Sequence, residues 1–274
     1  MLLEIVGIEK LKNYLEKELE LDFDSIKERI NFVDTKEGAL PAIDSSIRVI
    51  PFRGNRLALI VGAVIVNKDN DYYNSNTMLT DVEDENVKTL AMKYTEWQLI
   101  NEYDGTIIID GSPNIDKRLL EKYDLPIVNE YRDLIKANLE KTIFFAKKIT
   151  NWGITNIFGD EYIVSKYILD LLSLYYLEKN QPFYIEGRDI IFFNKKFKTI
   201  LAYFGRNPSL IVISPNNMDL LENIANYTNY YGVYEPIVLA DTIARQYSKL
   251  LAKKLIIEVG ELTTEREKTI EQWI

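Results

Sequence analysis

Two aspartates placed within or at the end of apolar stretches are the residues of this sequence best suited to chemistry. Asp44 lies in "PAIDSSIRVI", and Asp110 closes "GTIIID". If these stretches form neighbouring parallel strands, the two carboxylates lie side by side and repel each other, and a divalent cation is the natural reason for such a placement. Glu96 lies between them in the sequence, in a helical pattern beside Trp97, and could reach the same point.

Each acid also has an ordinary structural interpretation. The sequence "IDGS" is typical of a turn in which Asp accepts backbone hydrogen bonds and Gly takes a positive φ. A glutamate on a helix is most often a solvated surface residue. For one such motif alone the structural interpretation is favoured, but two aspartates on adjacent strands with a glutamate between them favour a metal site.

The composition narrows the chemistry further, because the 274 residues include no histidine and no cysteine. Disulfides, zinc fingers, thiol nucleophiles, Ser-His-Asp triads and imidazole ligands are therefore excluded. Acid–base or metal chemistry must use carboxylates, lysine, tyrosine or bound water. The net charge of −9 argues against a protein that coats nucleic acid, but it is compatible with a nuclease that gathers its acids at a metal site.

The elements that would position the acids follow from changes in hydrophobic period. Apolar spacing predicts helices over residues 2–32, and Ile- and Val-rich stretches predict three strands, followed by a polar loop, a helix capped by Asp84, and a short buried strand. The three strands are "PAIDSS", "IRVIPFR" and "RLALIVGAVIV", the loop is "NKDNDYYNSNTM", the helix is "DENVKTLAMKYTEWQLINEYD", and the last strand is "GTIIID".

Helices and antiparallel strands are predicted for the rest of the chain. In order, they are helices "KRLLEKY" and "RDLIKANLEKTIFFAKKI", strand "TNIFGD", helix "YIVSKYILDLLSLYYLEKN", strands within "FYIEGRDIIFFNKKFKTILAYFG" and "SLIVISP", helix "NMDLLENIANYTNYY", and a helix that begins near Pro236. The aromatic-rich helix "ILDLLSLYYL" carries more apolar surface than one helix face normally hides, which predicts a dimer. No apolar run reaches the length of a membrane helix, and the N-terminal stretch is typical of an amphipathic helix and not of a signal peptide, so a cytoplasmic protein is expected.

The order and spacing of four segments resemble the NurA family of archaeal nucleases over roughly residues 34–250. The segments are "AIDSSIRVIPFRGNRLALIVGAVIV", Glu96, "IIIDGSP" and "GVYEPIVLADTIARQY". The resemblance implies an α/β fold with an RNase H-like mixed sheet flanked by helices and with N-terminal and C-terminal helical additions. It also implies a single nuclease domain over 1–274, made of a helical segment (1–33), a core (34–250) and a tail (251–274).

The same resemblance implies a function and a set of site residues. Family members are dimers that hold Mn²⁺ or Mg²⁺, degrade the 5′ ends of DNA, nick single strands, and work with the hexameric ATP-driven translocase HerA at double-strand breaks. The metal ligands and catalytic acids fall on Asp44, Glu96 and Asp110. A late tyrosine falls on Tyr231 or Tyr234. In the late helix the family commonly has histidine, and this chain has Asp241.

The absent histidine leaves two interpretations open. Either Asp241 completes an all-carboxylate site, or the protein is a weakened relative that acts as a scaffold for DNA ends or for a translocase. The first is favoured because carboxylates suffice for two-metal catalysis. A phosphatase-like or nucleotide-binding α/β protein is less favoured, because no GxxxxGKS/T loop is present.

Basic clusters and tyrosines are candidate DNA contacts, although most such clusters are solvated surfaces. They are Arg48, Arg53, Arg56, Lys147, Lys148, Lys195, Lys196, Lys198, Tyr72, Tyr73, Tyr230 and Tyr231.

Overall fold

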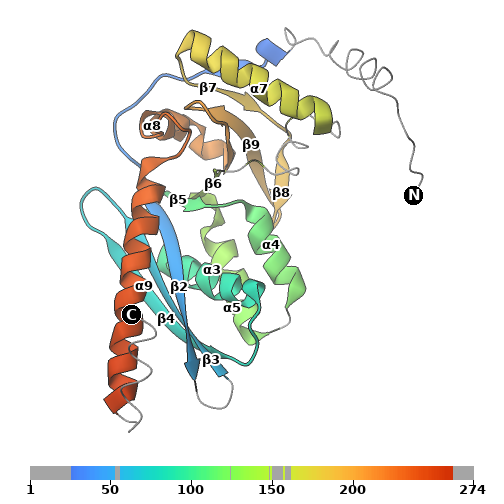
Figure 1. Ribbon diagram of the computed structural model, residues 1–274. Helices are drawn as coiled ribbons and strands as arrows, with labels where there is room; N and C mark the ends of the chain where they lie inside the picture. The colour runs from blue at the N-terminus through green and yellow to red at the C-terminus, as the bar shows by residue number, and fades with distance from the viewer. Residues whose placement is uncertain are drawn as a thin grey trace, which may run out of the picture. The chain divides into compact units, whose positions relative to one another are not determined.

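The structure is a computed structural model that describes residues 26–52, 56–123, 125–147, 149, 157 and 162–261 (Figure 1). The chain divides into a first unit, Met1–Glu37 with Phe145–Val233, and a second unit, Gly38–Phe144 with Tyr234–Ile274. The helices expected before residue 26, and "TNIFGD" apart from Ile157, lie outside the described residues. In the part of the chain that is described, no helix combines the length and the apolar character needed to cross a bilayer.

The second unit is built on a mixed sheet, which confirms the predicted α/β class. Its strands run in the order β6-β5-β2-β3-β4, where β2–β3 and β3–β4 are antiparallel and β2–β5 is parallel. The strands are β2 (Ala42–Phe52), β3 (Arg56–Val66), β4 (Tyr72–Thr80), β5 (Ile107–Asp110) and β6 (Thr142–Ala146), whose last two residues belong to the first unit. The helices are α3 (Glu85–Glu102), α4 (Pro113–Lys122), α5 (Pro126–Asn138) and α9 (Glu235–Glu261), with a 3₁₀ turn η2 (Leu139–Lys141).

Strand β3 explains why the sheet is covered on both faces. Its sequence "RLALIVGAVIV" is an unbroken apolar run, which is typical of a strand buried on two sides. Because side chains alternate along a strand, Leu59 and Val61 pack toward α3, whereas Val64 packs against Ala240 and Ala244 of α9. Figure 1 shows α3 and α9 beside this part of the sheet.

The polar loop predicted after residue 66 is wrong over Tyr72–Thr80, which forms β4. Polar side chains on the face toward α3 are satisfied there: the Asn76 amide donates to Thr95 Oγ1 at 3.0 Å and to Gln98 Oε1 at 2.6 Å. On the other face the Tyr73 ring packs edge-on against Tyr247 of α9. These contacts depend on tertiary structure, so composition alone indicated a loop.

Two further boundaries differ from the predictions. "AIDSSIRVIPF" is one continuous strand, β2, and not two. The helix predicted through "TIFFAKKI" ends earlier, at Asn138, and "TIFFA" forms β6. All residues of β6 are buried except Ala146, which is half-buried. Such a run belongs in the interior of a sheet, because β-branched and aromatic side chains pack well there. Helix α3, its Asp84 cap and β5 are confirmed; Asp84 accepts the Asn86 N–H at 2.8 Å.

The first unit contains antiparallel strands in the order β1-β7-β9-β10, and β8 also pairs with β9. These are β1 (Ile30–Phe32), β7 (Phe183–Glu186), β8 (Ile190–Phe192), β9 (Lys195–Tyr203) and β10 (Ser209–Ile213), together with helices α7 (Tyr162–Lys179), η3 (Pro215–Leu220) and α8 (Leu221–Asn226). Strands β7 to β10 and α7 agree with the sequence predictions, whereas β1 is a strand within a stretch that was predicted to be helical. Ile168 and Leu172 of α7 pack on Phe183, Leu201 and Tyr203.

Gly62 provides a test of how α9 is seated on the sheet. A Cβ at this position would lie 2.7 Å from Cδ1 of Tyr247 and 3.1 Å from the backbone nitrogen of Ser248. We expect Gly62→Val to lower the free energy of unfolding by about 1–3 kcal/mol, because backbone as well as side chain must move. Chemical denaturation would measure the change. Thr77→Val on the exposed side of β4 is the control, and an equal effect in both variants would contradict the close approach.

Candidate metal and active site

Parallel pairing of β2 with β5 places the two predicted aspartates next to each other. Ala42 pairs with Ile108 and Ile43 with Ile109, so Asp44 and Asp110 are the next positions on neighbouring strands. Such strands lie about 4.8 Å apart. Burial and repulsion from Glu96 raise the pKa of the Asp44 carboxyl, and repulsion from Asp110 adds to them, which shows that the two aspartates are close. The strand geometry expected from the sequence is therefore present.

Glu96 reaches the same region from α3 and is buried. The Ser45 hydroxyl donates to Glu96 Oε1 at 2.5 Å, and the Lys93 ammonium donates to Glu96 Oε2 at 2.7 Å. Lys93 also donates to the backbone carbonyl of Asp110 at 3.0 Å. One ammonium thus ties the helix that carries Glu96 to the end of the strand that carries Asp110.

A second buried carboxylate, Asp116 of α4, completes this charged cluster and was missed by sequence reasoning. It accepts the Trp97 indole N–H at 3.0 Å and the Tyr131 hydroxyl. The spacing of Lys93 and Glu96, three residues apart on a helix, was a visible signal for an ion pair. Asp116 gave a weaker signal, because an acid in the first turn of a helix is common for dipole reasons alone.

The cluster holds more negative charge than one ammonium can balance. Burial raises the pKa of Asp44 to about 7, and repulsion from Glu96 adds to the effect. Burial likewise raises the pKa values of Glu96 and Asp116, against the opposing attraction of Lys93. Burial alone would lower the pKa of Lys93, but the carboxylates of Glu96, Asp116 and Asp44 outweigh it and raise that pKa, so the ammonium stays charged.

This donor set fits a hard divalent cation at Asp44 and Asp110. Both supply carboxylate oxygens from adjacent positions on paired strands, and within the described part of the chain Asp44 forms no ion pair like that of Glu96 with Lys93. Among the described residues, no three acids already surround a point as metal ligands would. Ser45 and Lys93 each bind one oxygen of Glu96 and hold its carboxylate in place.

The other two predicted residues have contacts of their own in the structure. Asp241, on α9, forms an ion pair with Arg245 at 2.8 Å. Tyr231 belongs to the first unit, is 65% exposed, and packs edge-on against Tyr230. Its alternative, Tyr234, is fully buried, and its hydroxyl bonds the backbone N–H and C=O of Leu40 at 2.7 and 2.9 Å. Tyr234 therefore has a structural role at the entry to β2.

Several of the predicted basic contacts are engaged in ion pairs. Arg56 pairs with Asp81 at 3.0 Å. Lys196 and Lys198 share Asp189, at 2.5 and 3.3 Å. Arg53 and Lys148 lie outside the described residues.

A family comparison decides the identity of the fold. The family model for the NurA domain matches residues 38–246. The chain belongs to the NurA family. No curated protein matches the sequence.

Solved structures of NurA proteins share the fold at low sequence identity. "Crystal structure of NurA with manganese" is 11% identical with a TM-score of 0.60, over 92% of this chain and 97% of that one. "Crystal structure of NurA" is 12% identical with a TM-score of 0.60, over 98% and 100%. "Crystal structure of NurA bound to dAMP and manganese" is 11% identical with a TM-score of 0.55, over 85% and 92%. At such identities the likeness establishes the fold.

Replacement of Lys93 tests the charge balance of the cluster. We expect Lys93→Met to lower the free energy of unfolding at pH 7 by about 3–5 kcal/mol, because buried carboxylates lose their counter-ion. Urea denaturation would measure this, and part of the loss should be recovered at pH 5, where the acids bind protons. Lys88→Met, on the same helix but paired with the exposed Glu85, is the control. If Lys93→Met loses no more stability than Lys88→Met, or recovers none at pH 5, Lys93 is not the counter-ion of the buried carboxylates.

The raised pKa of Asp44 predicts a dependence of stability on pH in metal-free protein. Its carboxyl has a pKa of about 7 in the folded state against an ordinary value of 3.8, so between these values the folded state binds more protons than the unfolded state. Stability therefore falls as pH rises from about 4 to 7.

We expect Asp44→Asn to make this decline shallower, since asparagine keeps an oxygen for the Ser45 N–H and carries no charge. Thermal melts in EDTA from pH 4 to 8 would measure it, with Asp104→Asn at an exposed position as the control. Equal slopes in the wild type and in Asp44→Asn would refute the prediction.

Proposed function

We propose that this protein is a metal-dependent DNA nuclease that hydrolyses phosphodiester bonds. The observation that carries the proposal is the placement of Asp44 and Asp110 side by side on parallel strands, with Glu96 held behind them by Ser45 and Lys93. Membership of the NurA family, and a neighbour of the same fold bound to dAMP and manganese, support it.

In this mechanism Asp44 and Asp110 would hold the Mn²⁺ or Mg²⁺, with Glu96 as a further ligand. A bound metal would lower the pKa of a water and stabilise charge on the leaving oxygen. Lys93 and Ser45 fix the rotamer of Glu96, so that its carboxylate is in place before substrate arrives. No histidine is available as a general base, so proton transfer uses carboxylate or water.

The finer features of the function are also part of the proposal. They are 5′–3′ exonuclease and single-strand endonuclease activity, a role in DNA end resection with a HerA-type ATPase, a homodimeric state, and action in the cytoplasm. Tyr231 belongs to this wider proposal as a catalytic candidate, and Asp241 as a metal ligand that must exchange its Arg245 partner.

A second candidate function is a non-catalytic scaffold that binds DNA ends or a translocase. The observation that favours it is the Asp241–Arg245 ion pair at the position where the family commonly has histidine. In that case Asp44 and Asp110 would remain as structural acids.

A cleavage assay separates the two functions. We expect the full chain to cut labelled single-stranded DNA with Mn²⁺ and not with EDTA. Asp44→Asn and Asp110→Asn should each lower the rate by about 100-fold or more, because each removes a metal ligand from the reacting centre. Asp104→Asn should leave it unchanged.

The variants Asp241→Asn and Asp241→His extend the same assay. If Asp241 is a ligand, the first lowers the Mn²⁺ affinity and the second retains it. DNA binding without Mn²⁺-dependent cutting in the wild type would replace the nuclease proposal with the scaffold.

A further inference from the structure

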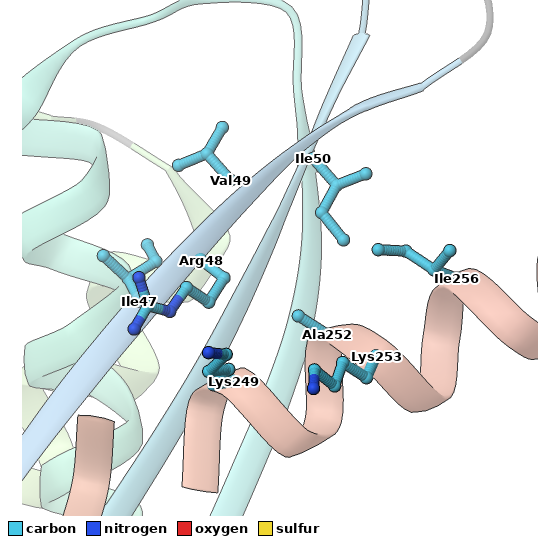
Figure 2. Close-up of a pocket in the computed structure, with 8 residues that line it drawn as sticks. All are labelled: Ile47, Arg48, Val49, Ile50, Lys249, Ala252, Lys253 and Ile256. Atoms are coloured by element: carbon cyan, nitrogen blue, oxygen red, sulfur yellow. The ribbon is translucent and has the colours of Figure 1, made fainter. Parts of the chain in front are cut away.

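A groove lies between the second half of β2 and the C-terminal half of α9, both within the second unit (Figure 2). Its volume is about 350 Å³. β5 pairs with β2 at Ala42 and Ile43, so the later part of β2, which lines the groove, lies beyond the β5 pairing. From there on, side chains of β2 and α9 face each other across open space.

The charge of the groove is unlike that of the chain as a whole. Arg48 of β2 faces Lys249 and Lys253 of α9, and no acidic residue is among the described residues that line it. Arg48 and Lys249 are exposed, and Lys253 is half-buried. Three cations without an intervening acid, in a protein of net charge −9, are complementary to an anionic ligand.

Apolar side chains fill the space between the cations. Ile50 of β2 and Ile256 of α9 point toward each other in Figure 2, and Ala252 lies between the two lysines and the strand. A simple inorganic anion has no apolar surface with which to contact these side chains. A ligand that alternates charged groups with apolar surface, as phosphates alternate with sugars and bases, uses both kinds of wall.

The position of the groove links it to the carboxylates. Arg48 follows Asp44 by four residues on the same face of β2, which is about 13 Å along a strand. On α9, Lys249 and Lys253 continue the i, i+4 row that begins with Asp241 and Arg245. The cations therefore lead away from the candidate metal site along two facing elements.

We propose that this groove binds the sugar–phosphate backbone of a single-stranded nucleic acid, with the scissile phosphate at Asp44 and Asp110. The proposal rests on the proposed nuclease function for the placement of the scissile phosphate. Arg48, Lys249 and Lys253 contact successive phosphates, and Ile50 and Ile256 contact the sugars and base faces. These residues determine binding and not the chemical step.

The test is binding of a fluorescent single-stranded oligonucleotide to the full chain in EDTA, with Asp44→Asn in every protein to prevent cutting. We expect the added triple change Arg48→Gln, Lys249→Gln and Lys253→Gln to raise Kd by about tenfold or more. The slope of log K against log salt concentration should fall in magnitude by about 2, because three phosphate contacts at about 0.7 each are lost. Lys254→Gln is the matched control, since Lys254 is exposed on the same helix and pairs with Glu258.

The outcomes separate this inference from the proposed function. An unchanged Kd and salt slope in a triple variant that still folds by circular dichroism, or an equal loss in Lys254→Gln, overturns the groove as the binding site. A change in self-association by light scattering, with DNA binding intact, would assign the groove to a second copy of the chain instead. Groove-dependent binding without Mn²⁺-dependent cutting in protein that retains Asp44 would support the groove and reject the nuclease.

Discussion

The Lys93 ammonium is the interaction on which the charged centre of the second unit depends. It binds Glu96 and the carbonyl of Asp110, and its charge is shared with Asp116 and Asp44. Buried carboxylates without a cation would repel each other and bind protons instead. One lysine thus allows acids from a strand and two helices to lie together in a folded protein before any metal binds.

The sequence was sufficient to predict the parts of the site that follow from strand order. A short parallel strand that ends in an acid and pairs with the first residues of β2 places Asp110 beside Asp44, so the two could be paired without coordinates. Lys93 and Asp116 could not be assigned in this way. Their roles depend on how α3 and α4 pack, and neither residue type is unusual on a helix surface.

The errors in the predicted fold have the same origin. β6 carries a helix-compatible apolar run, and only burial within the sheet decides that it is a strand. Tyr231 and Asp241 were chosen by resemblance to a family and stay predictions; Asp241 pairs with Arg245 in the described structure. Local pattern predicts which elements exist, whereas the partners of polar side chains are set by packing.

The polar strand β4 has a consequence for how copies of this protein meet. It is the outermost strand of the sheet in the second unit, so its outer peptide groups are open to a further strand. Its sequence "YYNSNTMLT" contains no charged residue and no proline, which are two of the devices that protect an edge strand from pairing with another molecule. The uncharged polar composition that made β4 look like a loop thus leaves this edge open to strand-by-strand growth of the sheet.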